Sequence, residues 1–428
     1  MIEPDRIIRK IGWRLLPLLM MLFFFNFLDR VNIGFAALDM NTSLGLSPVV
    51  FGWGAGIFFL SYAICQIPSS LMLNRFRVRV WIVSIAVAWG LASAGMAFVT
   101  GSKSFIGLRL LLGIAEAGFF PGFIYYLSCW FPRDARARFN AIFLIAVPLA
   151  SMLGNPLSGL ILSTGDMMGI PAWRWLFILE GLPSIFLGVV AFFWLSDSHA
   201  QATWLAPEER KWLADTIAAE HANTAKLTSD GLRGAVSDVR VAMLSIVSFC
   251  FIMGIYGVGL WLPQIVKDFG TTPLQTGFLS ALPYAASIVG MLFWGARSDA
   301  HHERRGHISA AALFSGASLI AASQFQSPIL SLLALSIAAA SIFAANAVLW
   351  TLPSNFLAGS AAAIGIAIIN SIGNLGGFAG PYLVGWVKAQ TGHFGPALMV
   401  LGVMSAAGGL LIFLAPFVFR RLKAPGFE

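Results

Sequence analysis

Charged side chains are scarce in this chain. Asp, Glu, Lys and Arg together make up 11% of its 428 residues, whereas soluble domains average about a quarter. Hydrophobic residues make up 58%, and the mean hydropathy is +0.81. The alternation of apolar and polar residues that marks a half-buried β-strand is also absent. This balance excludes an ordinary soluble domain and indicates an integral membrane protein built from α-helices.

Motifs that carry enzyme chemistry are lacking as well. The sequence has no nucleotide-binding loop, metal-ligand constellation or nucleophile triad, so we expect neither a pump nor a membrane enzyme, and no cofactor or metal. Three cysteines, Cys65, Cys129 and Cys250, lie within or at the ends of apolar stretches and are interpreted as small hydrophobic residues. A cleavable signal is not evident, because the first apolar stretch is long enough to remain as a helix.

Apolar stretches of about 20 residues, the length that a membrane-spanning helix needs, recur along the whole chain. Twelve of them lie near residues 14–38, 49–73, 79–100, 104–131, 139–164, 174–196, 241–266, 274–297, 308–325, 328–350, 360–387 and 394–419. We predict an all-α membrane protein with twelve transmembrane helices in two six-helix bundles, over residues 1–196 and 240–428. A cytoplasmic linker at 197–239 joins the bundles, with a short helix beginning near Pro207.

Similar residues recur in the two halves of the chain at a fixed separation. Asn74 and Asp299, which follow the second and eighth spans, are 225 positions apart. Pro156 and Pro381, in the fifth and eleventh spans, have the same separation. One large class of transporters is built from such a half repeated in parallel orientation, with its site at the midplane between the halves. The offset therefore predicts pseudo-symmetric bundles with a site between them.

Basic residues give the chain a net charge of +8, and their positions follow the topology. Counting spans from the N-terminus places 21 of the 27 Lys and Arg residues on one side of the membrane. Cytoplasmic loops carry this excess. We therefore expect both termini in the cytoplasm and a protein that interacts with the lipid bilayer, not with nucleic acid.

Four ionisable residues interrupt the apolar stretches. Asp29 and Arg30 lie in the first span, and Arg109 and Glu116 lie in the fourth. At about 1.5 Å per helical residue, both acids lie near the middle of the membrane. A charged side chain at that depth costs free energy, so it usually has a charged or hydrogen-bonding partner and a functional role. The second half has no charge at the positions 225 further along, so these charges indicate a specialisation of the first half.

The two acids are candidates for proton coupling. Arg109 and Glu116 are seven residues apart and share a helix face. A sheltered carboxyl can titrate when a neighbouring cation moves or is claimed by an anionic substrate. We therefore predict proton coupling at Asp29 and Glu116. The alternative is a permanent buried salt bridge that fixes the helix register.

Arg30 is the candidate ligand for an anion. Adjacent helical residues point about 100° apart, so Arg30 cannot share a face with Asp29 but lines up with Asn26, four residues earlier. A guanidinium keeps its charge and presents a planar fork that suits a carboxylate. A substrate with a carboxylate is therefore predicted. The alternative is that backbone carbonyls or Glu116 satisfy Arg30.

Further polar side chains lie at a similar depth. Tyr62, Asn370 and Asn374 are interpreted as ligand contacts or as hydrogen-bond partners between helices. Gln264 falls toward the outer end of the seventh span, and Trp350 falls near the inner end of the tenth. For a further buried acid, Glu180 in WRWLFILEG, we expect a structural partnership with Arg174, about two turns away.

These segments resemble the Major Facilitator Superfamily, specifically its anion:cation symporter family. The resemblance is carried by FLDRVNIGFAAL, RLLLGIAEAGFFPGFIYYLSCWFPRDARAR, WRWLFILEGLPSIFLGV and IGIAIINSIGNLGGFAGPYLVGW, and it extends over nearly the whole chain. Within the family, the sequence is similar to bacterial permeases for tartrate and 4-hydroxyphenylacetate. The resemblance implies twelve helices in two bundles, alternating access and proton-driven uptake of small organic anions.

The resemblance also implies roles for particular residues. It makes Asp29 a proton site, Glu116 the proton carrier, and Arg109 a gating partner. It makes Arg30 the ligand of the substrate carboxylate and Tyr62 a substrate contact. Polar residues of the seventh, tenth and eleventh spans contribute to the family's site, and the candidates for them here are Gln264, Trp350 and Asn370.

The sequence thus predicts a monomeric, proton-coupled importer in the bacterial inner membrane. Its substrate is expected to be a small organic anion: a hydroxy-dicarboxylate such as tartrate, a sugar acid or an aromatic acid. A proton-coupled exporter of amphipathic compounds is the first alternative, although Arg30 disfavours it because typical exported drugs are cations. A non-transporting membrane sensor is the second, although large output domains are missing.

Overall fold

The protein is helical wherever the structure describes it. The computed structural model describes residues 3–73, 75–225, 238–357 and 359–422. Asn74, used above for the internal repeat, lies outside these ranges, as do residues 226–237 of the expected linker. Among the described residues, β structure is limited to an isolated bridge between Met167 and Ile170. Helices satisfy their own backbone hydrogen bonds, which is what a chain surrounded by lipid requires.

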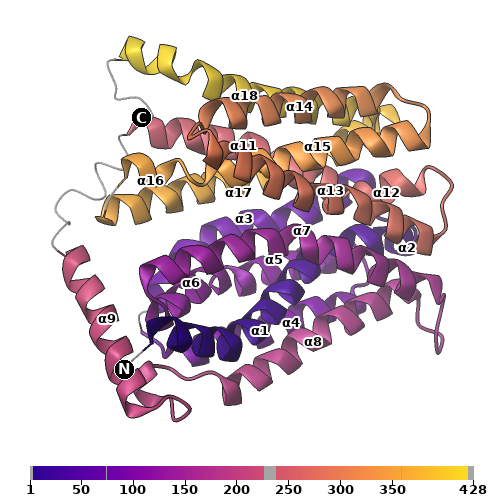
Figure 1. Cartoon of the computed structure of the whole chain (residues 1–428). Helices are drawn as coiled ribbons and strands as arrows, with labels where there is room; N and C mark the ends of the chain where they lie inside the picture. The colour runs from indigo at the N-terminus through magenta and orange to yellow at the C-terminus, as the bar shows by residue number, and fades with distance from the viewer. Residues whose placement is uncertain (1–2, 74, 226–237, 358, 423–428) are drawn as a thin grey trace.

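The first half of the chain forms one bundle, drawn in indigo and magenta in Figure 1. Its helices are α1 (Pro4–Val31), α2 (Ile33–Leu44), α3 (Pro48–Leu73), α4 (Val78–Gly95), α5 (Ser102–Glu116), α6 (Phe119–Trp130), α7 (Arg133–Ser163) and α8 (Ala172–Trp194). The 3₁₀ turn η1 (Met96–Phe98) extends α4.

The linker has a helix of its own. A 3₁₀ turn, η2 (His199–Gln201), precedes α9 (Pro207–Ala225), which begins at the predicted proline with Glu208 and Glu209 in its first turn. Lys10 Nζ at the start of α1 donates to Glu209 Oε2 at 2.7 Å, so α9 lies against the first bundle. The predicted linker helix is confirmed.

The second half forms the other bundle, drawn in red, orange and yellow. Its helices are α11 (Val239–Gly259), α12 (Leu262–Lys267), α13 (Pro273–Ala300), α14 (Arg305–Gln324), α15 (Pro328–Leu349), α16 (Pro353–Phe356), α17 (Gly359–Thr391) and α18 (Gly395–Leu422). The predicted repeat is visible in the element bounds. Pro48 and Pro273, which begin α3 and α13, are 225 positions apart.

The described helices supply a membrane-length segment for each predicted span. Eleven segments of the described chain are long and apolar enough to cross a membrane, and α17 is not among them. The 33 residues of α17 nevertheless extend over about 50 Å, well beyond a hydrocarbon core of about 30 Å. The prediction of an all-α membrane bundle is therefore confirmed.

Three of these spans are interrupted along their length. Asn32 separates α1 from α2, Gly118 precedes α6, and Trp261 separates α11 from α12. Asp29 and Arg30 lie just before the first interruption, and Glu116 is the last residue of α5. Irregular backbone at membrane depth is tolerated where protein or a cavity surrounds it. Asp29, Arg30 and Glu116 therefore lie where helices are broken, whereas the buried Arg109 and Glu180 lie inside α5 and α8.

The two bundles touch tightly at one end. We call the end where α1 begins and α18 ends the α9 end, because α9 lies there; α2 and α12 lie at the opposite end (Figure 1). The bundles pack through α3 against α17 and α7 against α13. A Cβ on Gly52 would lie 2.5 Å from the carbonyl oxygen of Pro381, and one on Gly159 would lie 2.7 Å from that of Pro273. Only glycine allows this backbone contact, and it is located near the opposite end.

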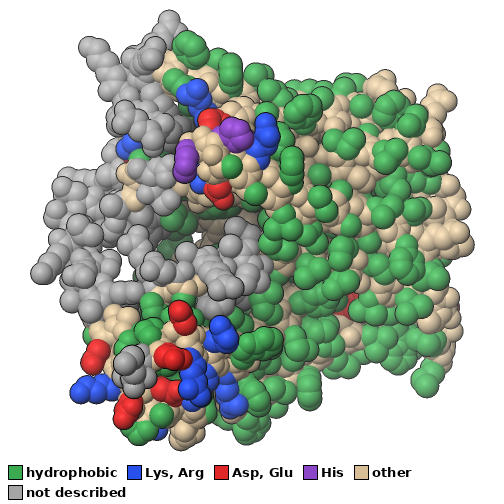
Figure 2. Space-filling view, viewed as in Figure 1, with side chains coloured by type: hydrophobic (Ala, Val, Ile, Leu, Met, Phe, Trp, Pro, Cys, Tyr) green, Lys and Arg blue, Asp and Glu red, His purple; other side chains and the backbone are tan. Residues whose placement is uncertain are grey.

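The surface differs between the two ends. On the face drawn in Figure 2, charged side chains gather at the α9 end, and apolar side chains cover the remainder. A hollow lies between the bundles at the α9 end of this face (Figure 2). The glycine contacts thus join the bundles near the opposite end, and the hollow lies between them at the α9 end of the face in Figure 2.

Candidate functional site

Arg30 and Glu116 form a buried ion pair between α1 and α5. Arg30 Nη2 donates to Glu116 Oε2 at 2.7 Å, and Arg30 Nε donates to the same oxygen at 3.1 Å. The side chain of Glu116 is 0% exposed and that of Arg30 is 12% exposed. Arg30 Nη2 also donates to Asn26 Oδ1 at 3.3 Å, which confirms the predicted i−4 alignment. Glu116 Oε1 makes no hydrogen bond in the described structure, so the pair has one free acceptor.

Aromatic rings enclose the Arg30 guanidinium. Its Cζ lies 5.0 Å from the ring centroid of Tyr62 and 5.2 Å from that of Phe58, both on α3. Tyr256 of α11 is also close enough to interact electrostatically with Arg30. A cation over an aromatic face is stabilised without being neutralised. Arg30 is therefore held at the interface between the bundles with its charge intact.

Arg109 is held differently from the sequence-based expectation. Its Nε and Nη2 each donate at 3.3 Å, to the backbone carbonyls of Gly54 and Ala55 in α3. Its Cζ lies 4.9 Å from the Phe58 ring centroid. Arg109 forms no described ion pair with Glu116, from which about 10 Å of helix axis separates it, but it still acts on Glu116 electrostatically. Arg30 of α1 contacts Glu116, which is the alternative that the sequence left open for Arg30.

Asp29 lies in a separate polar pocket inside the first bundle. Ser93 Oγ donates to its Oδ1 at 2.5 Å, and its Oδ2 accepts from Ser184 Oγ at 2.8 Å and from Trp89 Nε1 at 3.2 Å. Asp29 is 1% exposed, and no described cation forms an ion pair with it. As predicted, it points away from Arg30. Three hydrogen-bond donors from α4 and α8 take the place of a charge partner.

One of the two asparagines of α17 connects the two bundles. Asn370 Nδ2 donates to Gln66 Oε1 of α3 at 3.2 Å. Asn374 Nδ2 donates to the backbone carbonyl of Asn370 at 3.0 Å. The interhelical hydrogen bond that the sequence offered as one interpretation is therefore present. Gln66 was missed, because one amide in an apolar helix carries no sequence signal of its partner.

Gln264 and Trp350 lie outside the Arg30 cluster. Gln264 belongs to α12, beyond the break after α11, and Trp350 caps the end of α15. Both are partly buried. Neither is linked to Arg30 by a hydrogen bond or ring contact among the described residues. The structure therefore does not bring these two candidates together with the charged site.

Glu180 does not pair with Arg174. Ser158 Oγ donates to Glu180 Oε1 at 2.6 Å. Arg174 donates from Nη1 to the carbonyl of Ala97 at 2.9 Å and from Nη2 to that of Val99 at 3.5 Å. The predicted partnership is wrong, because carbonyls at the end of a helix lack intrahelical partners and attract the cation.

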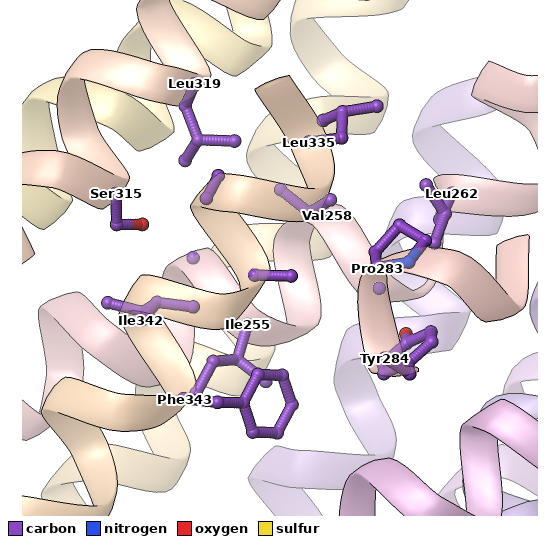
Figure 3. A pocket seen from close by; sticks show the side chains of 14 residues that line it. Ile255, Val258, Leu262, Pro283, Tyr284, Ser315, Leu319, Leu335, Ile342 and Phe343 are labelled. Atoms are coloured by element: carbon purple, nitrogen blue, oxygen red, sulfur yellow. The ribbon is translucent and has the colours of Figure 1, made fainter. Parts of the chain in front are cut away.

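The second bundle has a pocket of its own (Figure 3). It lies between α11, α13, α14 and α15. Its lining is almost entirely apolar, with Ile255, Tyr284 and Phe343 among the side chains and Ser315 as a polar exception. None of the predicted binding residues lines this pocket. The buried charges and this apolar pocket therefore belong to different bundles.

Comparison with protein families identifies the chain. The model of the Major Facilitator Superfamily matches residues 19–381, and again residues 244–426. The chain belongs to the Major Facilitator Superfamily. A protein of Agrobacterium vitis assigned as a tartrate transporter is 46% identical over 411 residues, covering 96% of this chain and 91% of that protein. The quinolone resistance transporter of Acinetobacter baumannii is 37% identical over 422 residues, covering 98% and 97%.

Solved structures agree on the fold. The xylose transporter XylE from E. coli, in a partially occluded inward-open conformation, matches with a TM-score of 0.78 at 16% identity, over 96% of this chain and 98% of that chain. At that identity the likeness concerns the fold alone. The chain is thus a multi-pass membrane protein of a transporter superfamily, and the predicted resemblance to tartrate permeases is confirmed.

Proposed function

We propose that this protein imports a small organic anion together with protons across the bacterial inner membrane. A hydroxy-dicarboxylate such as tartrate, a sugar acid and an aromatic acid are the substrate classes considered. The observation that carries the proposal is the ion pair between Arg30 and Glu116, located where the bundles meet. The relative assigned as a tartrate transporter supports the anionic substrate.

The pair suggests how protons and substrate are coupled. Glu116 is the carboxylate that holds Arg30, and a substrate carboxylate competes for the same guanidinium fork. Proton uptake by Glu116 removes its charge and frees Arg30 for the substrate. Release of the proton restores the pair and expels the anion. Asp29, with three donors and no cation, serves as a second proton site.

Alternating access follows from the asymmetry between the ends. We take the α9 end as cytoplasmic, because the predicted Lys and Arg excess lies there. The contacts of α3 with α17 and of α7 with α13 then close the outer end, and the hollow opens to the cytoplasm. Rocking of one bundle against the other around Arg30 would expose the site to either side.

Replacing Glu116 by Gln in proteoliposomes tests the proposal. With tartrate, gluconate and 4-hydroxyphenylacetate as probes, the wild type should accumulate one of them when the outside is acidic. Glu116→Gln should lose that accumulation and keep exchange of the same probe across the membrane. Glu209→Gln, the same substitution in surface helix α9, should accumulate the probe like the wild type. If Glu116→Gln still concentrates the probe, Glu116 is not the proton carrier.

Proton-coupled export is a second candidate, favoured by the quinolone resistance relative. The same vesicles distinguish it. An exporter should move a quinolone against its own gradient when a pH gradient is imposed, and it should leave the organic anions unmoved. For an importer of organic anions, the quinolone flux should not respond to the pH gradient.

A further inference from the structure

Glu180 is a buried acid that the mechanism above does not use. It lies on α8 and is 0% exposed. Its Oε1 accepts the hydrogen bond from Ser158, while its Oε2 makes none. No described cation forms an ion pair with it. An ionised carboxylate in this position would be very costly, because neither a countercharge nor enough donors compensate for lost water.

Asn32 lies beside this carboxyl at the break between α1 and α2. The Asn32 side chain interacts with Glu180, yet its Nδ2 and Oδ1 form no hydrogen bond of good geometry. Asn32 is 1% exposed. Buried polar groups without partners are rare and call for an explanation. A carboxyl that changes its protonation state would explain them. The protonated carboxyl donates and needs an acceptor, the ionised carboxylate needs a donor, and the Asn32 amide offers both.

Ser184 connects Glu180 to Asp29. The two residues of α8 are one turn apart and share a face. Ser184 Oγ donates to Asp29 Oδ2 at 2.8 Å, and Glu180 is close enough to act electrostatically on Asp29. A hydroxyl can donate and accept at once. In this structure the Ser184 hydroxyl is bonded to Asp29 and not to Glu180, so a proton passes from Glu180 to Ser184 only after one of these two side chains rotates.

Other charged groups around Glu180 are few. Helices α1, α2, α4 and α7 pack against α8. The charged neighbour on α1 is Asp29. Helix α2 carries Asp39, which is exposed and lies further toward the end opposite α9. Helix α7 contributes the neutral Ser158. From α4, Trp89 and Ser93 are bound to Asp29. Arg174 on α8 itself is bound to backbone carbonyls.

We propose that Glu180 is a proton-exchange site that passes protons between the end opposite α9 and Asp29. The inference rests on the proposed proton coupling. One proton leaves the Glu180 carboxyl for the Ser184 hydroxyl, which gives its own proton to the Asp29 carboxylate. Water at the end opposite α9 then reprotonates Glu180. This path runs inside the first bundle and bypasses the closed contact between the bundles.

Infrared difference spectroscopy of the purified protein tests the protonation of Glu180 without any transport. At neutral pH, the wild type should show a protonated-carboxyl band that shifts in D₂O and is missing in Glu180→Gln. Glu209→Gln should retain the band. Glu180→Asp, which keeps the acid, should show it at a changed frequency and serves if the Gln variant is unstable. An unchanged band in Glu180→Gln would overturn the proposal.

Transport in proteoliposomes tests the path. Using the probe that the wild type accumulates, Glu180→Gln should slow uptake driven by a pH gradient on the order of tenfold, while exchange at equal pH stays within about twofold, because a proton-transfer group was lost. Equal uptake by wild type and variant would overturn the role. If the wild type accumulates no probe, the proposed function fails, and the infrared band alone decides whether Glu180 exchanges protons.

Discussion

The three buried acids of the first bundle are stabilised in three different ways. Glu116 has a cation, Asp29 has three neutral donors, and Glu180 has one. Opposite charge compensates most fully for lost hydration, and hydrogen bonds compensate in part. The three carboxyls are therefore not interchangeable, and each should respond to substitution in its own way.

Removing Arg30 should destabilise the protein through Glu116. Arg30→Met leaves the Glu116 charge buried without a partner and should lower the free energy of unfolding by about 3–5 kcal/mol. Adding Glu116→Gln to the same protein should recover most of that loss, because the uncompensated charge is gone. Thermal unfolding in detergent measures both changes. If the double variant is no more stable than Arg30→Met, the loss comes from packing around Phe58 and Tyr62.

At the scale of elements, broken helices and glycine contacts position the site. The interruptions at Asn32 and Gly118 place Arg30 and Glu116 at helix ends. At Gly52, the backbones of α3 and α17 touch where a side chain would not fit. Because the backbones themselves touch, no single side chain can move aside to open this end of the molecule. The two bundles must move apart as rigid units, so the contact is a candidate gate.

Gly52→Ala should favour opening at this gate. The added Cβ would lie 2.5 Å from the Pro381 carbonyl oxygen, an overpacking that costs about 1–3 kcal/mol. Spin labels on Ser47→Cys and Thr391→Cys, in a protein without native cysteines, should report a longer mean distance. Gly107→Ala is the matched control, because a Cβ added there would meet nothing within 4 Å. An unchanged distance in Gly52→Ala would rule out this contact as the gate.

Sequence reasoning succeeded where a single helix determines the answer. The spans were predictable from runs of about 20 apolar residues, and the alignment of Arg30 with Asn26 was predictable from helical period. It left alternatives open where two helices must meet. The contact of Arg30 with Glu116 was only one of the alternatives for Arg30, and the contact of Arg109 with carbonyls of α3 was not foreseen, because tertiary packing decides which cation lies opposite which acid. The helix breaks were also missed, since Asn32 and Gly118 differ little from other residues in these spans.

At the scale of the whole molecule, charge gathers at the α9 end (Figure 2). Helix α9 is attached there by the ion pair between Lys10 and Glu209 and by stacking of Trp130 on Trp204, with ring centroids 5.5 Å apart. Both contacts lie on the first bundle. The linker therefore follows the motion of the first bundle.

Acidification should loosen α9. The hydrogen bond from Lys10 lowers the pKa of Glu209, so the pair contributes stability above the ordinary Glu pKa and loses it as the pH falls through the lowered value. The protection of α9 amides against hydrogen exchange, taken relative to the intrinsic exchange rate at each pH, should therefore fall on acidification below the ordinary Glu range. Glu209→Gln should show this low protection at every pH, and the protection of α14 should be unaffected. If the protection of α9 changes neither with pH nor with this substitution, the ion pair contributes nothing to the docking of α9 on the first bundle.

The location of the buried charges has a consequence for how such proteins diversify. Every charged residue that is fully buried in the described chain belongs to the first bundle, whereas the apolar pocket belongs to the second. If the proposed function holds, the buried charges and the apolar pocket can change independently during evolution. A chimera of this first bundle with the second bundle of a relative should then still depend on the pH gradient, which uptake of the relative's substrate in proteoliposomes would measure.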